Sequence, residues 1–109
     1  MSDMSASTSA HLAKVIELQA FLADMHGAAV LEHSYTLLLM GSFRLVVGTA
    51  NSRLKFDWDG REFYLNIKGC TCQSLAAPQE WQQLHNSRIA PPASAWPIIH
   101  QHCGQAFGA

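Results

Sequence analysis

The sequence predicts one α+β domain, built from an N-terminal helix, an antiparallel meander sheet of four to five strands, and two short C-terminal helices. Three observations lead to this fold class. Apolar residues recur with helical spacing before Gly27, the short turns 41–42 and 59–60 each lie between two strand-like segments, and proline or serine begins two apolar segments near the end. The chain has 109 residues, which suits a single domain. Consecutive hairpins between helices are typical of an antiparallel sheet with helices on a face.

The first helix is expected to begin at Ser7 or Ser9, either of which can cap it, and to end near His26, where Gly27 provides a stop. Residues 1–8 are expected to form a disordered tail, which leaves residues 9–109 as the domain. The broad apolar side of the helix consists of Leu12, Val15, Ile16, Leu18, Leu22 and Met25. This side predicts a helix that lies on the sheet. Residues 28–32 fit either a last helical turn or the start of a strand.

A first hairpin is predicted around Gly41-Ser42, because glycine followed by a polar residue suits a two-residue type II′ turn between strands 35–40 and 43–49. In the register that this turn implies, both faces of the hairpin are largely apolar. The second face carries Tyr35, Leu37, Leu39 and Val46. Such a pair of strands needs cover on both sides. We therefore expect the second face to meet the C-terminal helices, a ligand or another subunit.

A second hairpin is predicted around Asp59-Gly60, since Asp-Gly suits the positive φ angles of a two-residue type I′ turn. The implied register sets Phe56 opposite Phe63 and Asp57 opposite Glu62. The apolar face of this hairpin consists of Leu54, Phe56, Phe63 and Leu65. The other face is polar, as expected of a half-buried antiparallel pair.

The rest of the chain predicts helices. Residues 70–75 either extend the preceding strand or form a fifth short one. Pro78 suits the first position of a short helix that ends near Asn86 and buries Trp81 and Leu84. Ser94 can cap a final helix that ends at Gly104. The residues that this final helix is expected to bury are Trp96, Ile99 and Cys103.

Composition limits the function classes. Apolar residues make up 49% of the chain and charged residues only 14%, so some apolar surface is expected to meet another chain. The net charge of −1 does not provide the cationic field that nucleic-acid binding requires. The odd number of cysteines, three, predicts a reducing compartment. The polar N-terminus is not expected to be a signal peptide. No apolar run reaches membrane-spanning length. We expect a cytoplasmic protein that binds neither nucleic acid nor membranes.

The sequence contains three arrangements of reactive residues. None of them predicts a catalytic residue, a metal or a cofactor. Zinc ligation is a weak match to the residue spacing, and the residues concerned are Cys70, Cys72, His100 and Cys103. A nucleophilic Cys103 with His100 as its base lacks a recognisable signature. The carboxyl pair Asp57 and Glu62 could serve acid–base chemistry, but relief by Arg44, Lys55 or solvent is the simpler interpretation.

The sequence favours two classes of function over a small enzyme. The first is a non-enzymatic binding or accessory protein, a homodimer that contacts an unknown partner through an apolar sheet face. The second is a small-molecule-binding protein with a pocket between the sheet and the C-terminal helices. The candidate ligand or partner surface consists of Tyr35, Leu37, Leu39, Val46, Trp81 and Trp96.

Overall fold

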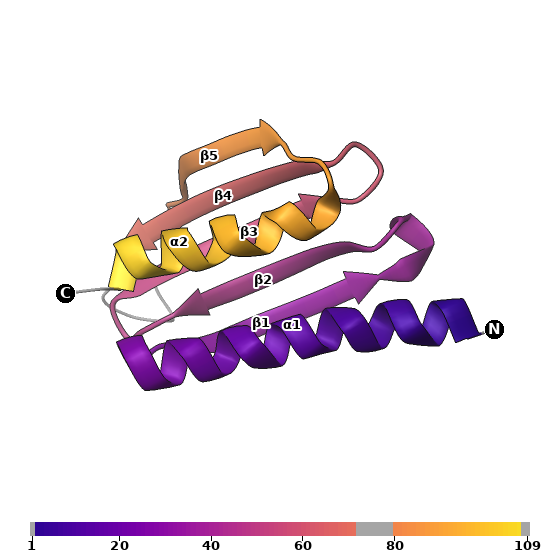
Figure 1. Cartoon of the computed structure of the whole chain (residues 1–109). Coiled ribbons are helices and arrows are strands. Elements are labelled where there is room, and N and C mark those ends of the chain that lie inside the picture. The colour runs from indigo at the N-terminus through magenta and orange to yellow at the C-terminus, as the bar shows by residue number, and fades with distance from the viewer. Residues whose placement is uncertain (1, 72–79, 108–109) are drawn as a thin grey trace.

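The computed structural model describes residues 2–71 and 80–107, which form an antiparallel sheet with two helices on one face (Figure 1). The elements are α1 (Ser2–His26), β1 (Ala29–Thr36), the 3-10 turn η1 (Leu37–Leu39), β2 (Ser42–Gly48), β3 (Ser52–Asp59), β4 (Tyr64–Thr71), β5 (Gln82–Arg88), the 3-10 turn η2 (Pro92–Ser94) and α2 (Ala95–Phe107). The five strands follow one another in the order β1-β2-β3-β4-β5. The predicted α+β class and meander sheet are confirmed.

α1 begins at Ser2, so the predicted cap at Ser7 or Ser9 is wrong. Residues 2–8 belong to this helix, and the division of the chain at residue 9 stays a prediction. The buried stripe of α1 is narrower than the sequence indicated, because it consists of His11, Leu18 and Leu22 with the partly buried Val15, whereas Leu12 and Ile16 are exposed. Gly27 ends the helix at φ 63°, and β1 starts two residues later.

The predicted register of the first hairpin is wrong. β1 ends at Thr36, Leu37–Leu39 form a 3-10 turn instead of a strand, and Tyr35 lies opposite Phe43. The paired positions Ser34 and Arg44 share the outer face of the sheet, on the side away from the helices. This arrangement points polar side chains outward, which a half-buried sheet favours. The second face of the hairpin is therefore not the continuous apolar surface that the sequence suggested.

The second hairpin has a four-residue loop, Gly60–Phe63, instead of the predicted two-residue turn. Phe56 lies opposite Ile67, four residues along from the predicted partner. Because four is an even number, the shift keeps Leu54, Phe56 and Leu65 on the buried face, as predicted. Gly60 does not have a positive φ angle, so the type I′ interpretation is also wrong.

The predicted helix over residues 78–86 is wrong where the structure describes it, because residues 82–88 form β5 and pair with β4. β5 is an edge strand with a polar sequence, and Leu84 is exposed instead of buried. Pairing with β4 satisfies its backbone, which local propensity cannot anticipate. Pro78 and residues 72–75 lie outside the described residues. The final helix is confirmed as α2, with Trp96, Ile99 and Cys103 buried, but its predicted end at Gly104 is wrong, because the helix continues to Phe107.

The core lies between the sheet and the two helices. Its fully buried large side chains are Leu18, Leu22, Leu45, Val47, Phe56, Leu65, Ile67, Ile99 and Cys103. The outer face of the sheet is more polar, and there Arg44 Nε donates a hydrogen bond to Asp57 Oδ1 at 2.6 Å. The Lys55 ammonium lies 4.5 Å from the centre of the Trp81 ring on the same face. Neither helix in the described part of the chain combines the length and apolarity that crossing a membrane requires.

Candidate functional site

An aromatic pocket of about 320 Å³ lies at one end of the sheet, where α1 and the start of α2 approach the turns that follow β1 and β3. We call this cavity the aromatic pocket. Six rings line it: His11, Tyr35, Phe43, Trp58, Phe63 and Trp96. Five of the ten Phe, Tyr and Trp residues of the chain are thus gathered around one cavity.

The rings of the aromatic pocket contact one another in series. His11 stacks on Tyr35 with ring centres 4.1 Å apart and an interplanar angle of 23°. Phe43 stacks on Trp96 at 5.2 Å and 11°. Trp58 and Phe63 are nearly parallel at 6.3 Å. Mutual contacts of this kind fix the rings in place, and rings held this way offer flat π surfaces to a planar guest.

His11 is the unusual member of this group, because it is a titratable residue with only 8% of its surface exposed. Its Nε2 atom lies 2.7 Å from Nε2 of His33 on β1. A hydrogen bond between two imidazoles requires one ring nitrogen to donate and the other to accept, so at least one ring is neutral. Burial, and secondly the neighbouring His33, lower the pKa of His11 to about 4. Burial also lowers the pKa of His33. Both imidazoles are therefore neutral at pH 7.

The backbone around the aromatic pocket is strained. In the described part of the chain, Met40 (φ 58°) and Phe63 (φ 59°) are the non-glycine residues with a left-handed conformation, and both line this pocket. Each such residue costs about 1–2 kcal/mol. Strain of this kind persists where the surrounding structure enforces it, and it clusters at binding and catalytic sites. The two turns that shape the pocket therefore have a conformation that local sequence preference opposes.

We expect Met40→Gly to stabilise the protein by about 0.5–1 kcal/mol, because glycine removes the left-handed strain but adds entropy to the unfolded chain. The Met40 side chain is 69% exposed, so little packing is lost. Urea unfolding measures the difference. Met40→Ala is the matched control, since it removes the same side chain but keeps the strain, and it should show no gain. Equal stability of the two variants would contradict the strained conformation.

The six sequence-predicted site residues do not form one site. Tyr35 and Trp96 line the aromatic pocket. Val46 and Trp81 line a shallow cavity on the outer face of the sheet. Leu39 lies at the edge of another outer cavity, and Leu37 is in the 3-10 turn between β1 and β2. The structure thus separates these residues, and their role as a ligand or partner surface stays a prediction.

The residues that sequence reasoning missed are His11, Phe43, Trp58 and Phe63. A signal for His11 exists in the sequence, because it begins the series 11, 15, 18, 22 that has the spacing of one helix face. The predicted apolar side of the helix starts at Leu12 instead, because an imidazole is not counted as an apolar group. Phe63 gave no usable signal, since it was placed in a strand and lies in a loop.

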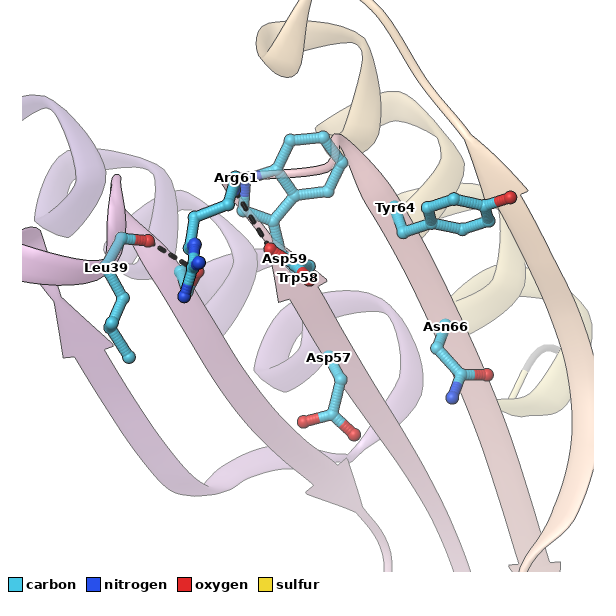
Figure 2. A pocket seen from close by; sticks show the side chains of 8 residues that line it. Leu39, Asp57, Trp58, Asp59, Arg61, Tyr64 and Asn66 are labelled. Atoms are coloured by element: carbon cyan, nitrogen blue, oxygen red, sulfur yellow. Dashed lines mark hydrogen bonds between the residues drawn. The ribbon is translucent and has the colours of Figure 1, made fainter.

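The outer pocket, of about 390 Å³, lies on the outer face beside the turns (Figure 2). Figure 2 shows Asp57 and Asn66 projecting from neighbouring strands toward the same side. Asp57 is already bound by Arg44, and Asp59 Oδ1 accepts hydrogen bonds from the backbone N–H groups of Arg61 and Glu62. Oδ1 of Asn66 is buried and has no hydrogen-bond partner among the residues that the structure describes. Charges of both signs surround this cavity, so its electrostatics select no ligand class.

The reactive arrangements weighed from the sequence are not assembled in the described part of the chain. Burial raises the pKa of the Cys103 thiol to about 12, so this residue is not a thiolate at neutral pH. Asp57 pairs with Arg44, and Glu62 instead lies 3.7 Å from Arg88. Among the described residues, no three His, Cys, Asp or Glu side chains gather closely enough to hold a metal ion, and Cys72 lies outside them.

Comparison with protein-family models, with curated proteins and with solved structures found no match. Among the described residues, those that line the aromatic pocket provide stacked rings, the neutral imidazole of His11 and the ammonium group of Lys14, and these groups favour binding over covalent chemistry.

Proposed function

We propose that this chain is a non-enzymatic binding protein that holds a small planar molecule in the aromatic pocket. The observation that carries the proposal is the coincidence of two features at one cavity. Half of the Phe, Tyr and Trp residues line it, and so do both strained non-glycine residues of the described chain. Backbone strain has no benefit to folding, so its placement around a ring-lined cavity favours a binding role.

The size and chemistry of the aromatic pocket indicate the kind of ligand. Its volume of about 320 Å³ is at the small end of the range for ligand sites, which is roughly 300–1,000 Å³. Six of its twelve lining residues have rings, and His11, Tyr35 and Lys14 supply a few polar groups. Such a site suits a molecule of one or two fused rings, bound by stacking and by a small number of directional contacts.

Tryptophan fluorescence provides a test, because Trp58 and Trp96 line the aromatic pocket whereas Trp81 lies on the outer face. Trp58 also lines the outer pocket, so the variants below are needed to tell the two pockets apart. In a Trp81→Phe background, titration with planar compounds such as naphthalene or indole derivatives should quench the emission in a saturable way. Phe63→Ala should weaken this binding about five-fold, because it removes one stacking surface.

The matched control is Tyr64→Ala. Tyr64 is the next residue in the chain and has nearly the same exposure, 42% against 39% for Phe63, but it lines the outer pocket. Its removal should leave the affinity unchanged. If Tyr64→Ala weakens binding and Phe63→Ala does not, the ligand occupies the outer pocket and the proposal is wrong. An absence of saturable quenching by every planar probe would also count against it.

The alternative function, an accessory protein that forms a homodimer and contacts another protein through the sheet, stays a prediction. Its original argument relied on an apolar second face of the first hairpin, and the observed register replaces that face with polar positions such as Ser34 and Arg44. The outer face is still the part of the sheet that no helix covers (Figure 1). A cytoplasmic location likewise stays a prediction.

A further inference from the structure

We propose that the ligand of the aromatic pocket is a small aromatic acid, with its rings between the aromatic walls and its anionic group beside the Lys14 ammonium. This inference rests on the proposed function and adds the chemical class of the ligand. It follows from the distribution of charge around the pocket, which is independent of the ring cluster that indicated binding.

The residues that line the aromatic pocket have a net positive charge. Among the described residues that line the aromatic pocket, Lys14 is the one with a formal charge at neutral pH, and no carboxylate lines the cavity. His11 is neutral there because its pKa is about 4. The pocket therefore presents a positive potential to a guest, although the whole chain has a net charge of −1.

The Lys14 ammonium can bind an incoming anion, because its present partner holds it only weakly. Its partner is Glu17, one turn further along α1, at 3.8 Å, and both side chains are largely exposed at 49% and 66%. Exposed ion pairs of this geometry contribute little free energy, so an incoming anion can replace Glu17 at small cost.

The Lys14 ammonium lies on the same side of α1 as one of the rings of the pocket. Lys14 follows His11 by three residues on α1, so the two lie on the same side of the helix. A ring that enters between the aromatic walls would leave its acid group near the half-exposed Lys14. The anion would then keep part of its hydration, and the cost of desolvating a charge stays small.

The start of α2 adds to this potential. Ala93 and Trp96 line the aromatic pocket, so the first turn of a 13-residue helix lies at the cavity. This first turn contains no acidic side chain. The amino end of a helix has a partial positive charge, which favours an anion in its vicinity.

The test compares 2-naphthoate with its neutral isostere 2-naphthamide by isothermal titration calorimetry at low salt. The wild-type chain should bind the acid about five-fold more tightly than the amide. Lys14→Gln should remove this preference by weakening the acid alone, whereas Lys14→Arg should keep it. Glu17→Gln removes the competing carboxylate and should strengthen binding of the acid. Added salt should weaken the acid and leave the amide unchanged.

The outcomes separate the two proposals. Equal affinity for acid and amide in the wild-type chain, or a preference for the acid that survives in Lys14→Gln, would overturn the aromatic-acid inference and leave ligand binding in the pocket intact. Failure of both compounds to bind would contradict the inference and the proposed function together.

Discussion

Replacing Gly60 by alanine should lower the free energy of unfolding by about 3 kcal/mol. A Cβ atom at this position would lie 2.1 Å from the carbonyl oxygen of Met40 and 2.8 Å from its carbonyl carbon. Both are backbone atoms, so no flexible side chain can move aside, and such overpacking typically costs about 1–3 kcal/mol. Separation of the two turns would also break the hydrogen bond that the Gly60 N–H donates to Ser42 Oγ at 2.9 Å, worth about 1 kcal/mol.

Urea unfolding of three variants checks this result. Ser42→Ala should lose about 1 kcal/mol, because it removes the hydrogen bond but not the close approach of the turns. Gly104→Ala is the matched glycine control, since its Cβ would meet no atom within 4 Å and alanine favours the helix. It should be neutral or stabilising. A Gly60→Ala variant as stable as Gly104→Ala would show that the turns of β1–β2 and β3–β4 do not touch as described.

Acid should destabilise the protein by about 3 kcal/mol through His11 alone. The pKa of His11 is about 4 in the folded state, below its ordinary value of 6.5, because burial disfavours the charged ring. The unfolded chain therefore takes up this proton first as the pH falls. The stabilising contribution is complete above about pH 6.5, declines between pH 6.5 and 4, and is gone below that range. The pKa difference of about 2.5 corresponds to about 3 kcal/mol.

The variant that isolates this effect is His11→Phe, which keeps a ring among Tyr35, Phe43 and Trp96 but cannot be protonated. Its stability should fall much less than that of the wild type between pH 6.5 and 4, as measured by urea unfolding at each pH. His85→Gln serves as the control, because His85 lies on β5 and contacts Ser87 and His102 instead, and it should keep most of the wild-type acid dependence. Parallel pH curves for wild type and His11→Phe would disprove the role of His11.

The side of the sheet to which each side chain points could be predicted from the sequence, whereas the residue opposite it on the neighbouring strand could not. Leu54, Phe56 and Leu65 were assigned to the buried side correctly, because side-chain direction depends only on alternation within each strand. The partner of Phe56 was wrong, because register depends on loop length. That length is fixed by non-local contacts, such as the approach of Gly60 to Met40, and by the hydrogen bonds of Asp59 to its own loop.

The same distinction explains what could be predicted of the candidate site. Tyr35 and Trp96 were selected as apolar residues of a strand and a helix, and both line the aromatic pocket. Phe63 and Met40 could not be selected, because their left-handed backbone arises where two hairpin ends meet. The strand β5 was missed for a related reason: its polar sequence becomes a strand only beside the edge of β4.

The meander order of the sheet has a consequence for how the aromatic pocket is assembled. Each strand pairs with its neighbour in the chain, so every pairing in the sheet closes only a short loop. The entropy cost of closing a short loop is small. The pocket is different, because His11 comes from the first helix and Trp96 from the last, eighty-five positions apart. Its walls are complete only when both helices lie on the sheet. A guest bound in the aromatic pocket would touch the first and the last helix at once, and it would stabilise the folded chain by holding both of them against the sheet.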